Sequence, residues 1–141
     1  MTETIELSIH SKLEFVDMVG SVTKSVTAKM GFDEDDASWI ELAVHEAVIN
    51  AITHGNRNAP DKQVDVRYII EADALTIYVR DRGKGFDPDK LPDPTNSDNL
   101  LNPTGRGIFY MRTFMDEVEH TIHPEGGSLV RMNKKKRQIN S

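Results

Sequence analysis

Three polar residues, Glu46, Asn50 and His54, recur at a spacing of four in one segment of the chain. In an α-helix this spacing places them in one stripe, because four residues make slightly more than one turn. Their neighbours are apolar, which predicts a stripe beside the core, where an unpaired polar group costs on the order of 1–3 kcal/mol and a charge costs more. A bound ion or ligand would offset this cost. Alternatively, the stripe lies at the edge of the helix and is solvated, and His54 alone is more typical of a helix end or of packing than of a ligand.

A second group of residues that could bind a ligand is the run Asp81-Arg-Gly83-Lys-Gly85-Phe86. It follows an alternating strand pattern, Leu75, Ile77 and Val79, whose odd-numbered phase Asp81 continues. Its carboxylate is therefore expected to point into the interior, as an acceptor among apolar groups. The two glycines allow a sharp turn and the close approach of a flat ligand. Such a run is also common in ordinary turns.

The third group is Thr104-Gly105-Arg106-Gly107, directly before an apolar helical pattern. Glycines at a helix start leave backbone N–H groups free to bind an anion, and the helix dipole favours phosphate there. Neither glycine pair fits the dinucleotide fingerprint, and the sequence lacks the phosphate loop of P-loop proteins.

The elements that must position these residues can be read from periodicity and turn residues. Ser11 and Glu14 form a capping-box pattern that predicts the start of a first helix, and Gly31 is expected to end it. Asp33 predicts the start of a second helix, which would run to about His54 with Gly55 as its terminator. Strands are expected at 4–9, 64–70, 75–79, 118–122 and 128–132, a third helix at 105–116, and a lid loop at about 87–104.

This order predicts one α/β domain over residues 1–141, a two-layer sandwich with a mixed, largely antiparallel sheet and the helices on one face. A net charge of -6 argues against direct nucleic-acid binding, and the sequence has no apolar run of membrane-spanning length. The absence of cysteine and of a signal-peptide pattern favours a cytoplasmic location. The basic residues at about 134–141 are interpreted as a solvated tail, with an electrostatic docking arm as the alternative.

Together and in this order, the three segments resemble the N box and the two glycine boxes of the Bergerat (GHKL) ATPases, the superfamily of gyrase, histidine kinases and MutL. The resemblance spans roughly residues 39 to 130. The short chain, the spacing of Glu46 and Asn50, and the segment Phe114 to Val118 are most similar to the anti-sigma-factor serine/threonine kinases of bacteria.

The resemblance implies ATP and Mg²⁺ as cofactors, with Glu46 as general base on a serine hydroxyl of an anti-anti-sigma (STAS-domain) partner. It implies that Asn50 helps to bind Mg²⁺ and that Asp81 accepts a hydrogen bond from the adenine amino group. Arg106 would neutralise phosphate charge. The other residues that the resemblance places at the nucleotide are His54, Gly83, Gly85, Phe86, Thr104, Gly105, Gly107 and Ser128.

The resemblance also implies binding to a sigma factor and a homodimer through the first strand and helix. Two departures bear on function: Asn102-Pro103-Thr104 stands where relatives often carry a basic residue, and Gly20 stands where some carry a charged one. The alternative function is an ATP-responsive binding module without phosphoryl transfer. The catalytic half of a histidine kinase is disfavoured, because the sequence has no room for a phosphoacceptor hairpin.

Overall fold

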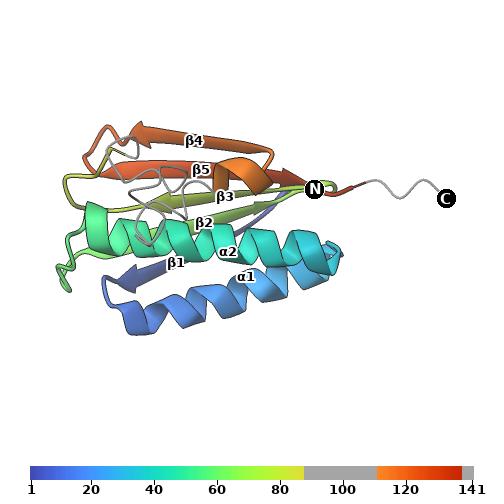
Figure 1. Ribbon diagram of the computed structural model, residues 1–141, viewed down its shortest axis with the longest axis horizontal. Helices are drawn as coiled ribbons and strands as arrows, with labels where there is room; N and C mark the ends of the chain where they lie inside the picture. The colour runs from blue at the N-terminus through green and yellow to red at the C-terminus, as the bar shows by residue number, and fades with distance from the viewer. Residues whose placement is uncertain (88–110, 138–141) are drawn as a thin grey trace, which may run out of the picture.

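The computed structural model describes residues 1–87 and 111–137. In chain order its elements are β1 (Glu3–His10), a short 3-10 helix (Leu13–Phe15), α1 (Val16–Met30), α2 (Glu34–Asn50), a π-helical turn (Ala51–Gly55), β2 (Gln63–Ile70), β3 (Ala74–Arg80), β4 (Glu117–Ile122) and β5 (Ser128–Lys135). The strands form one sheet in the order β1-β2-β3-β5-β4, and each neighbouring pair is antiparallel. Figure 1 shows α1 and α2 alongside each other against this sheet. The predicted two-layer α/β sandwich is confirmed, and the described sheet is antiparallel throughout rather than mixed.

The core lies between the helices and the inward phase of the strands. On β2 the alternation buries Val64, Val66 and Tyr68, and on β3 it buries Leu75, Ile77 and Val79. These side chains form one cluster with the inner faces of α1 and α2. Because β5 inserts between β3 and β4, β3 occupies the middle of the sheet, and a residue at its end is covered from both sides.

The start of α1 differs from the capping-box prediction. Lys12 precedes the 3-10 helix, and it makes no side-chain capping bond. The hydroxyl of Ser11 instead donates to the carbonyl of Lys62 at 2.6 Å, and Ser11 is buried. The prediction failed because this tertiary partner competes for the hydroxyl that a cap would use. Gly31 does end α1, with φ of 79°.

Asp33 caps α2 as predicted, because its carboxylate accepts from the backbone N–H of Asp36 at 2.7 Å. The second helix is shorter than expected, however. It is α-helical only to Asn50, and the predicted last turn is π-helical. Gly55 lies inside that turn and has no left-handed conformation, so it does not terminate the helix as a glycine C-cap would.

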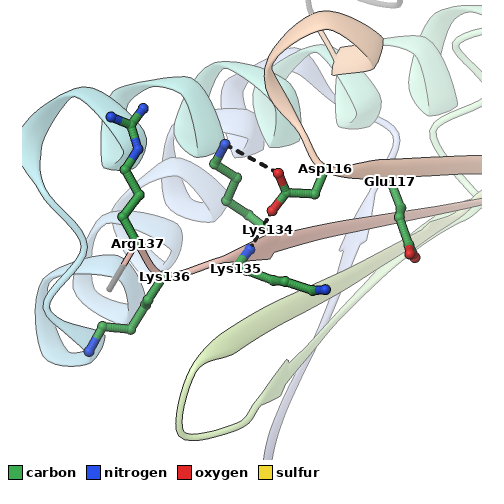
Figure 2. A pocket seen from close by; sticks show the side chains of 6 residues that line it. All are labelled: Asp116, Glu117, Lys134, Lys135, Lys136 and Arg137. Carbon is green, nitrogen blue, oxygen red and sulfur yellow. Dashed lines mark hydrogen bonds and ion pairs between the residues drawn. The ribbon is translucent and has the colours of Figure 1, made fainter. Parts of the chain in front are cut away.

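The basic residues near the C-terminus are more ordered than a solvated tail. Lys134 and Lys135 belong to β5, and Lys134 Nζ donates to the Phe114 carbonyl at 2.9 Å and lies 3.8 Å from Asp116 (Figure 2). Arg137 Nη2 lies 3.0 Å from the carboxylate of Asp36, which is almost fully buried at the first turn of α2. The tail prediction is thus wrong for Lys134 and Lys135, which belong to β5, and ion pairs to acids elsewhere in the fold hold the side chains of Lys134 and Arg137.

The predicted lid falls outside the described residues apart from Asp87, as does most of the predicted third helix. Residues 111–114 are helical, and Met115 and Asp116 separate them from β4. In the described part of the chain, no helix has the length and apolar character that crossing a membrane requires.

Candidate active site

The helix α2 positions Glu46 and Asn50 one turn apart. Its inner face buries Ile40, Val44 and Val48, which fixes the rotation of the helix on the sheet. Asn50 lies at the C-terminal end and is 5% exposed, whereas Glu46 is half-buried. The polar stripe therefore runs along the border of the core, and only its last α-helical member is buried. None of the hydrogen bonds within residues 1–87 and 111–137 uses the side chain of Asn50, so its amide remains available to a ligand.

His54 lies on the π-helical turn that follows. It is half-buried, and its ring centroid lies 5.8 Å from that of Phe86. Burial lowers the pKa of the imidazole below its ordinary value, so the neutral ring is favoured near pH 7. This packing against Phe86 connects the end of the α2 segment to the loop after β3.

Asp81 follows the last residue of β3, and the predicted inward orientation is confirmed by an exposure of 1%. Its Oδ2 accepts from the backbone N–H of Ser128 and its Oδ1 from that of Gly83, both at 3.1 Å. Burial raises the pKa of this carboxyl group. Hydrogen bonds from the backbone N–H groups of Ser128, Gly83 and Gly85, and the electrostatic effect of His120, lower the pKa of Asp81 and oppose this rise only in part. The fold thus holds an acceptor in a fixed orientation where desolvation disfavours its charge.

Glycines surround this carboxylate because no side chain would fit. A Cβ on Gly55 would lie 2.6 Å from the Cβ of Asp81 and closer still to its carboxylate. A Cβ on Gly127 would lie 3.0 Å from Asp81 Oδ1, and one on Gly83 would overlap the Gly55 carbonyl. Gly85 has φ of 78°, a conformation that glycine adopts without strain. Position 83 therefore requires glycine because the backbone of Gly55 and Asn56 packs directly against it.

Ser128 begins β5 and connects Asp81 to the loop after β3. Its backbone N–H donates to Asp81, and its hydroxyl accepts from the N–H of Phe86 at 2.9 Å. Ser128 is 1% exposed, because it shares the inward face of β5 with Val130 and Met132. The Phe86 ring in turn packs edge-on against His120 of β4, with centroids 4.9 Å apart.

A narrow cavity opens beside this cluster, between the end of α2 and the edge of the sheet. Its lining residues come from α2, the loop after β3, residues 111–112 and the last two strands: Ala47, Asn50, Phe86, Met111, Arg112, Val118, His120 and Val130. The lining includes Asn50 but neither Glu46 nor Asp81. Asp81 is connected to it through Ser128 and Phe86, and Glu46 lies one helical turn before Asn50.

Of the predicted site residues, the structure therefore brings Asp81, Gly83, Gly85, Phe86 and Ser128 into one hydrogen-bonded cluster, with His54 and Asn50 beside Phe86. Residues 104–107 lie outside the described residues. Sequence reasoning missed Gly127, and it missed Gly55 as a packing partner of Asp81. It also missed His120, although His120 shares the inward phase of Val118 on β4 and could have been found from that alternation.

The model of the histidine kinase-like ATPase domain matches residues 9–134. The chain belongs to this family. Its membership of the Bergerat ATPases, predicted from the three boxes, is confirmed.

Relatives within the family carry the names expected from the resemblance. The serine-protein kinase RsbW of Bacillus velezensis is 32% identical, over 92% of this chain and 84% of its own length. The anti-sigma F factor of Thermoanaerobacter pseudethanolicus is 34% identical, over 94% of both chains.

A solved structure shares the fold. The structure of the RsbU and RsbW domains of Rv1364c from Mycobacterium tuberculosis superposes with a TM-score of 0.69 at 16% identity. It covers 96% of this chain, which corresponds to 33% of that longer one.

Proposed function

We propose that this chain is an ATP-dependent serine/threonine protein kinase that phosphorylates an anti-anti-sigma partner and acts as an anti-sigma factor. The observation that carries the proposal is the buried carboxylate of Asp81, fixed at the end of the central strand and hydrogen-bonded through Ser128 to Phe86, which lines the cavity beside α2. The names of the relatives support the same reaction and the same class of partner.

Asp81 is proposed to accept a hydrogen bond from the adenine amino group. An ionised carboxylate has acceptor sites only, so it matches the amine of adenine and disfavours the carbonyl that guanine carries at the same ring position. Its two oxygens accept from the backbone N–H groups of Gly83, Gly85 and Ser128, and a carboxylate has about four acceptor sites, which leaves one for a ligand. Gly83, Gly85 and Phe86 would shape this part of the site, and Ser128 would hold the loop in place.

Glu46 is proposed as the general base that accepts the proton of the attacking serine hydroxyl. It is half-buried and lies one turn from Asn50, which allows it to face a partner that approaches from solvent. In the described part of the chain no cluster of three or more His, Asp or Glu side chains could hold a metal ion. A Mg²⁺ ion with one protein ligand fits that finding, because Mg²⁺ commonly keeps water and phosphate oxygens as its other ligands. The unbonded amide of Asn50 is the proposed protein ligand. Thr104, Gly105, Arg106 and Gly107 remain the predicted phosphate-binding residues.

We also propose three protein partners for this chain. A STAS-domain protein would supply the serine or threonine, and a sigma factor would be the protein that is sequestered. For a homodimer we propose the edge formed by β1 and the start of α1. β1 is an outer strand of the sheet, and three exposed large apolar side chains belong to this region: Ile5, Leu13 and Met18. A cytoplasmic location would suit these partners.

Incubation with γ-labelled ATP and candidate STAS proteins tests the proposal. The wild-type chain should transfer label to a partner serine or threonine, and Glu46→Ala should bind ATP with similar affinity but lose most of the transfer rate. Glu41→Ala, a half-buried glutamate earlier on α2, is the matched control and should retain activity. If Glu46→Ala transfers label at the full rate, the general-base assignment is wrong.

The alternative is an ATP-responsive binding module without phosphoryl transfer. The stretch Asn102-Pro103-Thr104 favours it, because the family resemblance implies a basic residue at this place and this stretch has none. ATP-dependent capture of a STAS protein with no transferred label would support this alternative over the kinase.

A further inference from the structure

Asn56 is a buried polar residue that the catalytic proposal does not use. It follows the π-helical turn directly and is 2% exposed. The two residues after it, Arg57 and Asn58, have φ of 51° and 60°, a left-handed conformation that is unfavourable for most side chains. The backbone keeps such a conformation only where surrounding contacts require it. Asn56, directly before this pair, is held by three side-chain hydrogen bonds.

Its side-chain amide makes three hydrogen bonds to three different parts of the fold. Nδ2 donates to the hydroxyl of Ser11 at 2.7 Å and to the carbonyl of Gln63 at 3.1 Å. Oδ1 accepts from the backbone N–H of Arg82 at 2.8 Å. Both donor hydrogens and the acceptor are therefore used, and Asn is the residue type of this size that supplies all three.

The third bond is the one that reaches the nucleotide site. The N–H of Arg82 belongs to the peptide group that joins Asp81 to Arg82, directly before Gly83. The backbone of Asn56 also contacts this turn, because a Cβ on Gly83 would lie 3.0 Å from the Cα of Asn56. The other end of Arg82 is held separately, since its Nε donates to Asp65 at 2.8 Å.

We propose that Asn56 is a positioning residue for adenine recognition: its bond to the Arg82 amide fixes the peptide after Asp81 and so holds the Asp81 carboxylate in the orientation that the purine requires. This inference rests on the proposed role of Asp81. Asn56 does not touch the nucleotide in this account. It acts through the backbone and through Asp81.

A double-mutant cycle on nucleotide discrimination tests the inference. The affinities of ATP and GTP are measured by titration calorimetry for wild type, Asn56→Ala, Asp81→Asn and the double variant. Asn56→Ala should weaken ATP by about tenfold, the equivalent of roughly one hydrogen bond, and leave the weaker GTP affinity nearly unchanged. In the Asp81→Asn background the same change should alter ATP affinity by less than about twofold, because Asn56 acts only through Asp81.

Ser11→Ala is the matched control. It removes a bond to the same amide but leaves the bond from the Arg82 N–H intact. It should lower the urea midpoint, as Asn56→Ala does, while keeping the wild-type ratio of ATP to GTP affinity. If Asn56→Ala does not unfold cooperatively, Asn56→Ser replaces it, since the shorter serine hydroxyl does not reach the Arg82 amide.

The outcomes separate this inference from the function on which it rests. If Asp81→Asn alone leaves ATP affinity unchanged, the proposed adenine site is wrong, and the positioning role of Asn56 is then wrong as well. If Asp81→Asn weakens ATP but Asn56→Ala leaves the ATP to GTP ratio at the wild-type value, the adenine site stands and the role of Asn56 is overturned. Equal losses from Asn56→Ala in both Asp81 backgrounds would likewise overturn it.

Discussion

Gly55→Ala should displace the Asp81 carboxylate, although the substitution adds only one methyl group. The new Cβ would lie 2.6 Å from the Cβ of Asp81 and closer still to its carboxylate, whereas real Cβ atoms essentially never approach another heavy atom within 3.0 Å. Neither side can move easily, because Gly55 is held in the π-helical turn and Asp81 is 1% exposed. The carboxylate must therefore leave its position.

The energetic consequence follows from the bonds of Asp81. Its oxygens accept from the N–H groups of Gly83 and Ser128, and a hydrogen bond to a charged group contributes about 1.5–3 kcal/mol. Loss of one or both, together with about 1–3 kcal/mol of overpacking, predicts a destabilisation of about 3 kcal/mol or more. That is a large share of the roughly 5–15 kcal/mol by which ordinary domains are stable. ATP affinity should fall with the displaced carboxylate.

Urea unfolding and titration calorimetry measure the two effects, and Gly20→Ala is the control. Gly20 lies within α1, and an added Cβ there would meet no atom within 4 Å. The same substitution should therefore stabilise the fold by about 0.5–1 kcal/mol through helix propensity and leave ATP binding unchanged. A Gly55→Ala protein with the wild-type urea midpoint and ATP affinity would refute this packing argument.

Two further predictions concern ionised groups. Burial raises the folded pKa of Asp81 above its ordinary 3.8, so the folded state binds more protons than the unfolded state between those two values. The unfolding free energy of the wild type should therefore fall relative to that of Asp81→Asn as the pH rises through this interval, and it should stay lower above it. Urea unfolding from pH 3.5 upward measures this difference. If the unfolding free energies of both proteins change with pH in the same way, the assignment is contradicted. Arg137→Ala should cost about 1 kcal/mol, because the buried Asp36 carboxylate loses its partner while solvent screens the exposed guanidinium. Arg57→Ala, an exposed arginine without an ion pair among the described residues, is the control, and equal urea midpoints for the two variants would contradict it.

Local pattern predicted the orientation of Asp81 correctly because period-two alternation persists to the end of β3 and fixes which way the next residue points. The same alternation on β5 places Ser128 on the inward face with Val130 and Met132. These features depend only on neighbours in sequence.

The features that failed or were missed depend on partners far away in the sequence. Ser11 matches a capping box, yet its hydroxyl donates to Lys62, which lies 51 positions away. Gly55 looks like a helix terminator, but its role is set by Asp81 across the interface between α2 and the sheet. No residue type in the sequence clearly indicates the π-helical turn. The hydrogen bond of Asn56 to the Arg82 N–H forms only in the folded chain, which brings the two residues together.

The most direct test of the adenine site is a calorimetric titration of ATP into wild type and Asp81→Asn, with Asp61→Asn, an exposed loop residue, as control. The account predicts that Asp81→Asn weakens ATP by about 10- to 150-fold, the equivalent of roughly 1.5–3 kcal/mol for a hydrogen bond to a charged group, while Asp61→Asn binds as wild type does. Equal ATP affinities for wild type and Asp81→Asn would contradict the claim that this buried carboxylate recognises the nucleotide.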